Sequence, residues 1–497
     1  MTEDIYCHEN GLQHINLIDD EGFSALFVVN TPIFDNSGVA HGVEHMVFRR
    51  STAFPQAETL FQLTSLTDAK INASTCANKT YFHCQSQCSY TFMLAIKYLL
   101  NGLFAPTFDA EDLRCEIYGG DNKGVIYQEL IGIEQANNKE SQSRQKSETN
   151  AFSYGGMSHL IGDLSLNDLL AFHQYYYQAS NITLVTANAN VEKIAHLIDL
   201  LPTQTEQSTR VKIAVAKHRK QSLSRGQSSG QSSGQSDVKS DASVSVQHNE
   251  DNEHQQQKYP PAINKLISVY YRWLHDPYYQ EIQDYKEIDN TKKRLTPHQE
   301  TLPVDTQHYL VPALMDLSTQ LVNDIETNTV YVNKPTKPSS LPTLFTQLCQ
   351  QAKRMSQGYA TDQHNALWLT HIETTDEVIA NITSYIISAY PDFLAPRCQG
   401  FCYATQALTI EKSAYLAIYS AFDVSPDNRL KELPDCLVRL SQDEHFIGMS
   451  LALAKIKYCR AYQLDNIELN SQVNNNQVMQ VTATDISTYL QSLASRA

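Results

Sequence analysis

The stretch Gly38-Val39-Ala40-His41-Gly42-Val43-Glu44-His45 is the segment on which the predicted fold and site depend. It follows the turn-forming residues Asp35-Asn36-Ser37, which favour the start of a helix at this point. Two histidines four residues apart project from one face of a helix, so both imidazoles can bind one metal ion. The order His-x-x-Glu-His, the reverse of the more common His-Glu-x-x-His, therefore predicts zinc bound by His41 and His45.

Glu44 lies beside the two candidate ligands on the same predicted helix. Its carboxylate can accept a proton from a water molecule that zinc has made more acidic, and can pass that proton to a leaving amine. A pattern with three fixed positions also arises by chance, in which case the histidines simply lie on a surface helix. A third ligand is needed to separate these two interpretations.

Catalytic zinc usually takes three protein ligands, and Glu129 is the best candidate for the third. It lies within residues 123–132, among apolar neighbours where an unpaired carboxylate would be costly. Glu134 faces about 140° away on an ideal helix and is expected to be solvated. Glu116 precedes the Gly119-Gly120 break and is a weaker candidate.

Predicted strands and helices surround this segment. Runs rich in β-branched and aromatic residues predict strands at 25–29, 70–76, 80–84 and 181–187, and helical spacing predicts helices from about residue 90 and over 125–133. In the second half, residues 377–390 and 446–457 favour helices, and residues 414–419 favour a strand. Residues 259–345 give few signals. This mixture predicts an α+β fold.

The composition changes between residues 203 and 258, where Gln, Ser, Gly, Asp, His and Asn dominate. Such a segment cannot bury enough apolar surface to offset its chain entropy, so it predicts a disordered polar linker. The chain is thereby divided into a zinc-binding unit, residues 1–202, and a carboxy-terminal unit, residues 259–497. Each unit is expected to hold a mixed sheet with packed helices.

Composition also excludes several classes of protein. The net charge is −16, which argues against a nucleic-acid partner, and no run approaches the roughly 20 apolar residues of a membrane-spanning helix. The acidic start, residues 1–8, lacks a signal or transit pattern and predicts a cytoplasmic protein. Ten cysteines without a CxxC pair indicate reduced thiols. Cys76, Cys84 and Cys88 with His83 fit no metal cage.

Several patches resemble, in the same order, those of the pitrilysin or insulinase family of metallopeptidases, and within it the presequence protease branch. Residues 38–45 look like that family's zinc helix, and residues 123–129 like its third-ligand helix. The resemblance implies two pitrilysin-like domains and one zinc ion per chain. It also implies an edge strand that binds substrate, and the residues carried over to that strand are Asn72, Ala73, Ser74 and Thr75.

A second patch, residues 397–403, is similar to the Arg and Tyr pair of the family's carboxy-terminal domain. The resemblance implies that Arg397 holds the substrate and that Tyr403 stabilises the tetrahedral intermediate. A buried Arg and a core Tyr are the alternative. The family's Ser-Tyr-Arg-Asp-Pro stretch has become Ser420-Ala421-Phe422-Asp423, and the chain is about half the length of a presequence protease.

The resulting prediction is a zinc metalloendopeptidase, or oligopeptidase, that hydrolyses short unstructured peptides along the edge strand with Glu44 as the base. Two alternatives remain open. One is a non-catalytic binding or assembly subunit that keeps the fold. The other is a half-enzyme that closes its chamber only as a homodimer or with a partner subunit.

Overall fold

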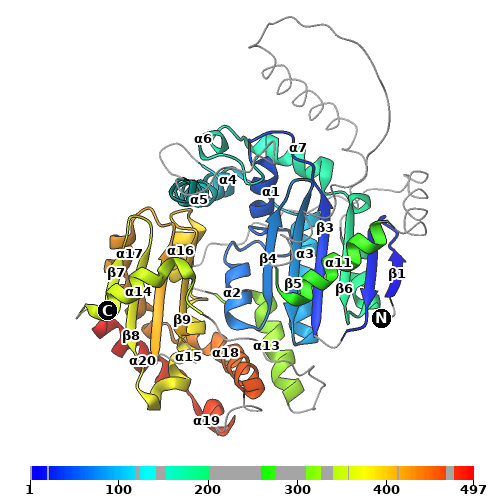
Figure 1. Cartoon of the computed structure of the whole chain (residues 1–497). Coiled ribbons are helices and arrows are strands. Elements are labelled where there is room, and N and C mark those ends of the chain that lie inside the picture. Colours follow the sequence, from blue (N-terminus) through cyan, green and yellow to red (C-terminus); the bar gives the residue numbers. More distant parts are fainter. Residues whose placement is uncertain are drawn as a thin grey trace, which may run out of the picture.

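The computed structural model describes residues 3–19, 22–118, 124–141, 153–201, 259–275, 309–325, 340–355, 358–410, 414–465 and 475–497. Two β-sheets with packed helices form its framework and lie side by side in Figure 1. The predicted α+β fold is confirmed. The predicted linker, residues 203–258, lies outside the described residues.

The first sheet has six strands in the order β1-β2-β6-β3-β5-β4. Its neighbouring strands run antiparallel except for β2 and β6, which are parallel. The strands are β1 (Glu3–Cys7), β2 (Gln13–Leu17), β3 (Phe23–Asn30), β4 (Lys70–Thr75), β5 (Lys79–Ser86) and β6 (Ile182–Ala187). The four strand predictions for this half are confirmed, whereas β1 and β2 were not predicted.

Helices cover both faces of this sheet. Ala25, Phe27 and Val29 of β3 point into a core shared with α3, and the alternating residues Leu26 and Val28 point into a core shared with α11. The helices of this part are α1 (Val39–Val47), α2 (Thr59–Leu66), α3 (Ser89–Phe104), α4 (Ala110–Glu116), α5 (Val125–Ser141), α6 (Ser158–Ile161), α7 (Leu166–Tyr176), η1 (Ala179–Asn181), α8 (Val191–Asp199) and α11 (Pro261–Leu274). Thus α11 packs on the first sheet although it follows the predicted linker in the sequence.

The second sheet has four antiparallel strands in the order β7-β8-β10-β9. They are β7 (Tyr359–Thr361), β8 (Ala366–His371), β9 (Ala404–Ile410) and β10 (Tyr415–Ala421). The accompanying helices are α13 (Pro312–Ile325), η3 (Thr343–Phe345), α14 (Thr346–Arg354), η4 (Thr374–Asp376), α15 (Glu377–Ile387), α16 (Pro391–Cys398), α17 (Pro426–Gln442), α18 (Glu444–Asp465), α19 (Asn475–Gln480) and α20 (Ala483–Arg496). Within the described ranges, every helix is too short or too polar to span a bilayer.

Polar contacts of α2 join the two sheets. Gln62 is 1% exposed. Its amide donates to the carbonyls of Tyr309 and Ala389, both at 3.2 Å, and its carbonyl accepts from the Val311 N–H at 2.9 Å. Lys457 of α18 donates to the carbonyls of Thr64 and Ser65, at 3.0 and 2.8 Å, and so satisfies the carboxyl end of α2.

We predict that Gln62→Leu lowers the free energy of unfolding by about 2–4 kcal/mol, measured by urea denaturation, because two buried backbone groups and one partly buried carbonyl lose their hydrogen bonds to Gln62. Gln351→Leu is the matched control, since Gln351 is an exposed residue of α14 and its change should stay within about 0.5 kcal/mol. Equal values for the two variants would show that Gln62 does not join the sheets.

Candidate metal centre

Glycines bring a loop close to the first turn of α1. Gly38, the residue before the helix, has a left-handed φ of 76°, and Gly156 has φ 88°. A Cβ atom on Gly156 would lie 2.6 Å from the Gly38 Cα, so the two backbones can pack this closely only without side chains. The approach places the Gly155 carbonyl beside His41.

Each imidazole of α1 is fixed through its Nδ1 atom. His41 Nδ1 donates to the Gly155 carbonyl at 3.0 Å, and His45 Nδ1 donates to Glu116 Oε2 at 3.1 Å. A hydrogen bond at Nδ1 leaves the lone pair on Nε2 available and sets the orientation of the ring. Both histidines are therefore prepared to bind a metal ion through Nε2.

Glu129 of α5 completes this group. Its Oε2 atom lies 3.6 Å from His41 Nε2 and 3.7 Å from His45 Nε2. Ligand atoms of a tetrahedral zinc ion lie about 3.3–3.6 Å apart. Within the described part of the chain, His41, His45 and Glu129 form the one such group of potential metal ligands. Two imidazoles and a carboxylate form a donor set that suits zinc.

The surroundings of Glu129 Oε2 test whether a metal ion fits between these three side chains. This atom is buried, and it has no hydrogen-bond partner among the described residues. A buried carboxylate oxygen without a partner is costly unless a cation balances it. A divalent metal ion between the three side chains would supply that partner.

Glu44 faces the end of β4. The side chain is largely buried, and its Oε2 accepts a hydrogen bond of 2.5 Å from the Thr75 hydroxyl. Thr75 is the last residue of β4, the strand at the edge of the sheet. The structure thereby brings a carboxylate of α1 and the candidate substrate strand together.

Among the strands described, β4 pairs with β5 alone, so its other edge offers backbone groups to an extended peptide. Asn72 and Ser74 face His83 and Tyr81 of β5, and Ala73 and Thr75 face Phe82 and Thr80. Asn72 is exposed, and the Ser74 and Tyr259 hydroxyls share a hydrogen bond of 2.6 Å. The four predicted substrate-binding residues thus lie on one free edge.

Glu116, the last residue of α4, has a role that the sequence did not reveal. It is 2% exposed and binds Arg49 and Arg397 as well as His45. Burial alone would raise the pKa of Glu116, but the positive charges of Arg397, His45 and Arg49 hold this pKa well below its usual value. Burial alone would lower the pKa of His45, yet Glu116 raises it. Glu116 is therefore an ionised carboxylate that orients His45.

The two residues predicted from the carboxy-terminal patch approach the same place. Arg397 donates to both oxygens of Glu116, at 2.8 and 3.2 Å. Tyr403 is half-buried. The negative charge of Glu129 and, to a smaller extent, burial raise the pKa of the Tyr403 hydroxyl. Arg397 thus binds the carboxylate that orients a candidate ligand, and Tyr403 lies within the electrostatic influence of the cluster.

Other candidate ligands lie elsewhere. Glu134 was expected to be solvated, but it is half-buried and accepts hydrogen bonds from the Ser158 backbone N–H and hydroxyl, at 2.9 and 2.7 Å. The ten cysteines are free thiols. Burial lowers the pKa of His83 to about 4. These residues belong to no metal-binding group within the described ranges.

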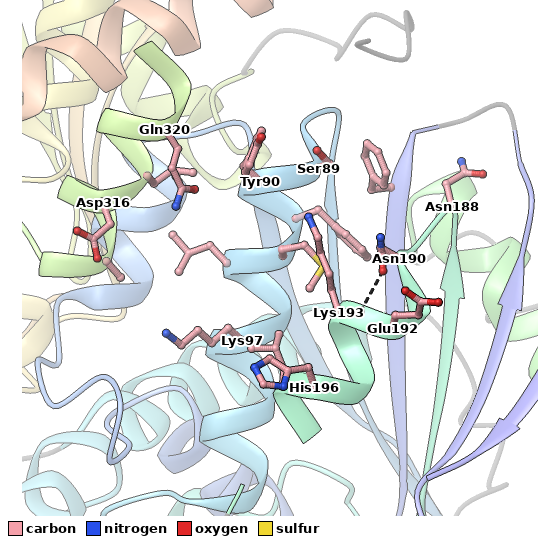
Figure 2. A pocket seen from close by; sticks show the side chains of 17 residues that line it. Ser89, Tyr90, Lys97, Asn188, Asn190, Glu192, Lys193, His196, Asp316 and Gln320 are labelled. Atoms are coloured by element: carbon pink, nitrogen blue, oxygen red, sulfur yellow. Dashed lines mark hydrogen bonds between the residues drawn. The ribbon is translucent and has the colours of Figure 1, made fainter. Parts of the chain in front are cut away.

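A pocket lies away from the candidate metal ligands. Its volume is about 750 Å³, and it is lined by residues of α3, α8 and α13, including Lys97, Lys193 and Asp316. Figure 2 shows Lys97, Lys193 and Asp316 on three different helices, with Asn190 capping α8 through the Lys193 N–H. None of the metal-cluster residues lines this groove. The convergence of ligand atoms, rather than this pocket, marks the candidate site.

Comparison with known proteins finds similarity in the part of the chain that holds the candidate metal ligands. Residues 34–130 match the family model for insulinase, peptidase family M16. The mitochondrial presequence protease of Candida albicans is 29% identical over 201 residues, which cover 36% of this chain and 19% of the relative. An uncharacterized protein of Borreliella burgdorferi is 26% identical over 206 residues, or 39% of this chain and 21% of the relative. The family resemblance predicted from the sequence is confirmed.

The matched region makes up about a fifth of each of these relatives, 19% and 21%. Among solved structures, the crystal structure of a peptidase M16 inactive domain from Pseudomonas fluorescens aligns over 99% of this chain and 95% of that chain. Its sequence identity is 11% and its TM-score is 0.31.

We predict that Glu116→Gln weakens zinc binding about 10- to 100-fold, because the amide no longer holds the His45 imidazole with a full negative charge. The measurement is a competition with a zinc-sensitive indicator. Glu111→Gln is the matched control, since Glu111 lies on the same helix but is exposed and pairs with Arg114. Equal affinities of the two variants would exclude the orienting role of Glu116.

Proposed function

We propose, on the premise that this chain is a member of the pitrilysin/insulinase family (M16), that it is a zinc-dependent endopeptidase acting on short unstructured peptides. The observation that carries the proposal is the convergence of His41, His45 and the unpartnered Glu129 oxygen. Three ligands of this kind leave one coordination position free, as in catalytic rather than structural zinc sites.

A zinc ion bound to these three residues would supply Lewis-acid chemistry, which polarises a carbonyl group and makes water more acidic. Glu44 precedes His45 on α1, and its carboxylate is held by Thr75 at the edge of the sheet. From this position Glu44 accepts a proton from the attacking water and delivers it to the leaving amine. The Thr75 hydroxyl orients the Glu44 carboxylate for both transfers.

The substrate is proposed to add a strand to the free edge of β4. Backbone hydrogen bonds bind an extended peptide with little demand on its side chains, so cleavage tolerates many sequences. Because β4 ends at Thr75, which contacts Glu44, a peptide on this edge passes beside the proposed base.

Tyr403 is proposed to stabilise the tetrahedral intermediate. Nearby negative charge and burial raise the pKa of its hydroxyl, so the hydroxyl keeps its proton at neutral pH. A protonated hydroxyl can donate a hydrogen bond to the oxyanion that develops on the substrate carbonyl.

A half-enzyme is the second candidate. It is favoured by the observation that the matched region makes up about a fifth of the presequence protease relative, 19%. A second copy of this chain, or another subunit, would then complete the substrate chamber. In that case the rate per chain rises with protein concentration, whereas an active monomer has a constant rate per chain.

We predict that Glu44→Gln keeps about one zinc per chain but lowers kcat for a quenched fluorescent peptide at least about 1,000-fold, because the amide cannot accept the proton. Zinc content is measured by elemental analysis of the same preparation. Glu134→Gln, on α5 and bound to Ser158, is the control that should retain activity. Hydrolysis by Glu44→Gln at the wild-type rate would exclude the mechanism, and absence of zinc from the wild type would favour the binding-subunit alternative.

A further inference from the structure

Two residues from the part of the chain that holds the second sheet reach the elements that carry the candidate metal ligands. Arg397, at the end of α16, contacts Glu116 of α4. Phe422, directly after β10, contacts Gly132 of α5. Glu116 is the hydrogen-bond partner of His45, and Gly132 lies on the same helix as Glu129.

The contact of Arg397 is a bidentate ion pair with a buried partner. The Arg397 side chain is 11% exposed and that of Glu116 is 2% exposed. Both oxygens of Glu116 are used, and Oε2 is the atom that also accepts from His45. A bidentate pair fixes the plane of the carboxylate, so Arg397 acts on His45 through Glu116.

The loop after Arg397 docks onto α4 at the same place. A Cβ atom on Gly400 would lie 2.3 Å from the Cys115 carbonyl oxygen, so only glycine allows this approach. Arg49, which follows α1, donates to the Cys398 carbonyl as well as to Glu116. The loop and the helix are therefore tied together on both sides of the carboxylate.

Phe422 packs directly onto α5. A Cβ atom on Gly132 would lie 2.2 Å from Cε1 of the Phe422 ring, so the ring occupies the space above this glycine. Gly132 is three residues from Glu129, and residues three apart are neighbours on a helix surface. The Phe422 ring therefore packs against the turn of α5 that carries Glu129, the third candidate ligand.

The backbone of Phe422 is in a conformation that few non-glycine residues adopt. Its φ is +47°, in the left-handed region. The Asn365 side chain accepts a hydrogen bond of 3.2 Å from the Phe422 N–H, and the Asp423 N–H donates to the His364 carbonyl at 2.7 Å. Strain that is held by specific partners and aims a ring at another element is typical of a functional constraint.

We propose that the carboxy-terminal part of the chain positions the metal ligands, with Arg397 acting through Glu116 on His45 and Phe422 acting through Gly132 on Glu129. Arg397 and Phe422 are positioning residues. The nature of the metal rests on the proposed function, but the contacts themselves do not. By linkage, docking of the second sheet strengthens metal binding, and metal binding strengthens docking by the same factor.

The test is a double-mutant cycle of Gly132→Ala, Phe422→Ala and the two together, measured as zinc affinity by indicator competition and as hydrogen exchange of residues 125–134 in the chelator-treated protein. Each single variant is expected to bind zinc about 10-fold more weakly and to exchange faster over this segment. The double variant should be no weaker than Phe422→Ala, because the added methyl group then has no ring to meet.

Gly448→Ala is the matched control. Gly448 lies inside α18, and a Cβ atom there would meet nothing within 4 Å. Alanine favours a helix more than glycine, so this variant should leave both readouts unchanged or slow the exchange. An opposite effect of the same substitution at Gly132 identifies the contact with Phe422 as the cause.

Arg397→Met separates positioning from substrate binding. A positioning role predicts about 10-fold weaker zinc binding without any peptide present. A role in substrate binding alone predicts unchanged zinc affinity and a raised KM.

Additive effects in the cycle, or unchanged zinc affinity and exchange in both single variants, would overturn the proposal. A wild-type protein that binds no zinc would contradict the proposed function, and the exchange data alone would then decide whether Phe422 braces α5.

Discussion

The buried carboxylate of Glu116 is the point on which the rest of the site depends. It accepts hydrogen bonds from His45 of α1, from Arg49 after that helix, and from Arg397 of the second half of the chain. A carboxylate that is 2% exposed is stable as an anion only with such partners. Its charge fixes the imidazole, and its two guanidinium partners hold the two halves of the chain against each other.

The local parts of the site could be predicted from the sequence. Helical spacing alone places His41 and His45 on one face, and the apolar setting of Glu129 identifies a carboxylate that needs a partner. The strands at β3, β5 and β6 follow from their composition. These features depend on a few neighbouring residues, which is why one sequence is enough to find them.

The long-range parts could not be predicted in this way. Glu116 lies 71 residues from His45 and 281 from Arg397, and no spacing rule connects them. Glu134 was expected to be solvated because it faces away from Glu129 on an ideal helix, but its hydrogen-bond partner Ser158 lies 24 residues away in the sequence. The position of Arg397 was inferred from a family resemblance that assigns it to the substrate, whereas the structure pairs it with Glu116. Phe422 stands where the family stretch carries Arg. Its contact with Gly132 cannot be predicted from the sequence, because it becomes evident only in the folded structure.

The arrangement links binding, chemistry and assembly through short contacts. Thr75 joins the edge strand to Glu44, Glu116 joins His45 to Arg397, and Gly132 joins the helix of Glu129 to Phe422.

We propose that His41, His45 and Glu129 bind one zinc ion. X-ray absorption spectroscopy at the zinc edge tests it most directly. This ligand set predicts nitrogen and oxygen neighbours at about 2.0–2.2 Å, with two imidazoles and no sulfur. A sulfur neighbour at about 2.3 Å would instead indicate cysteine ligands, and would contradict it.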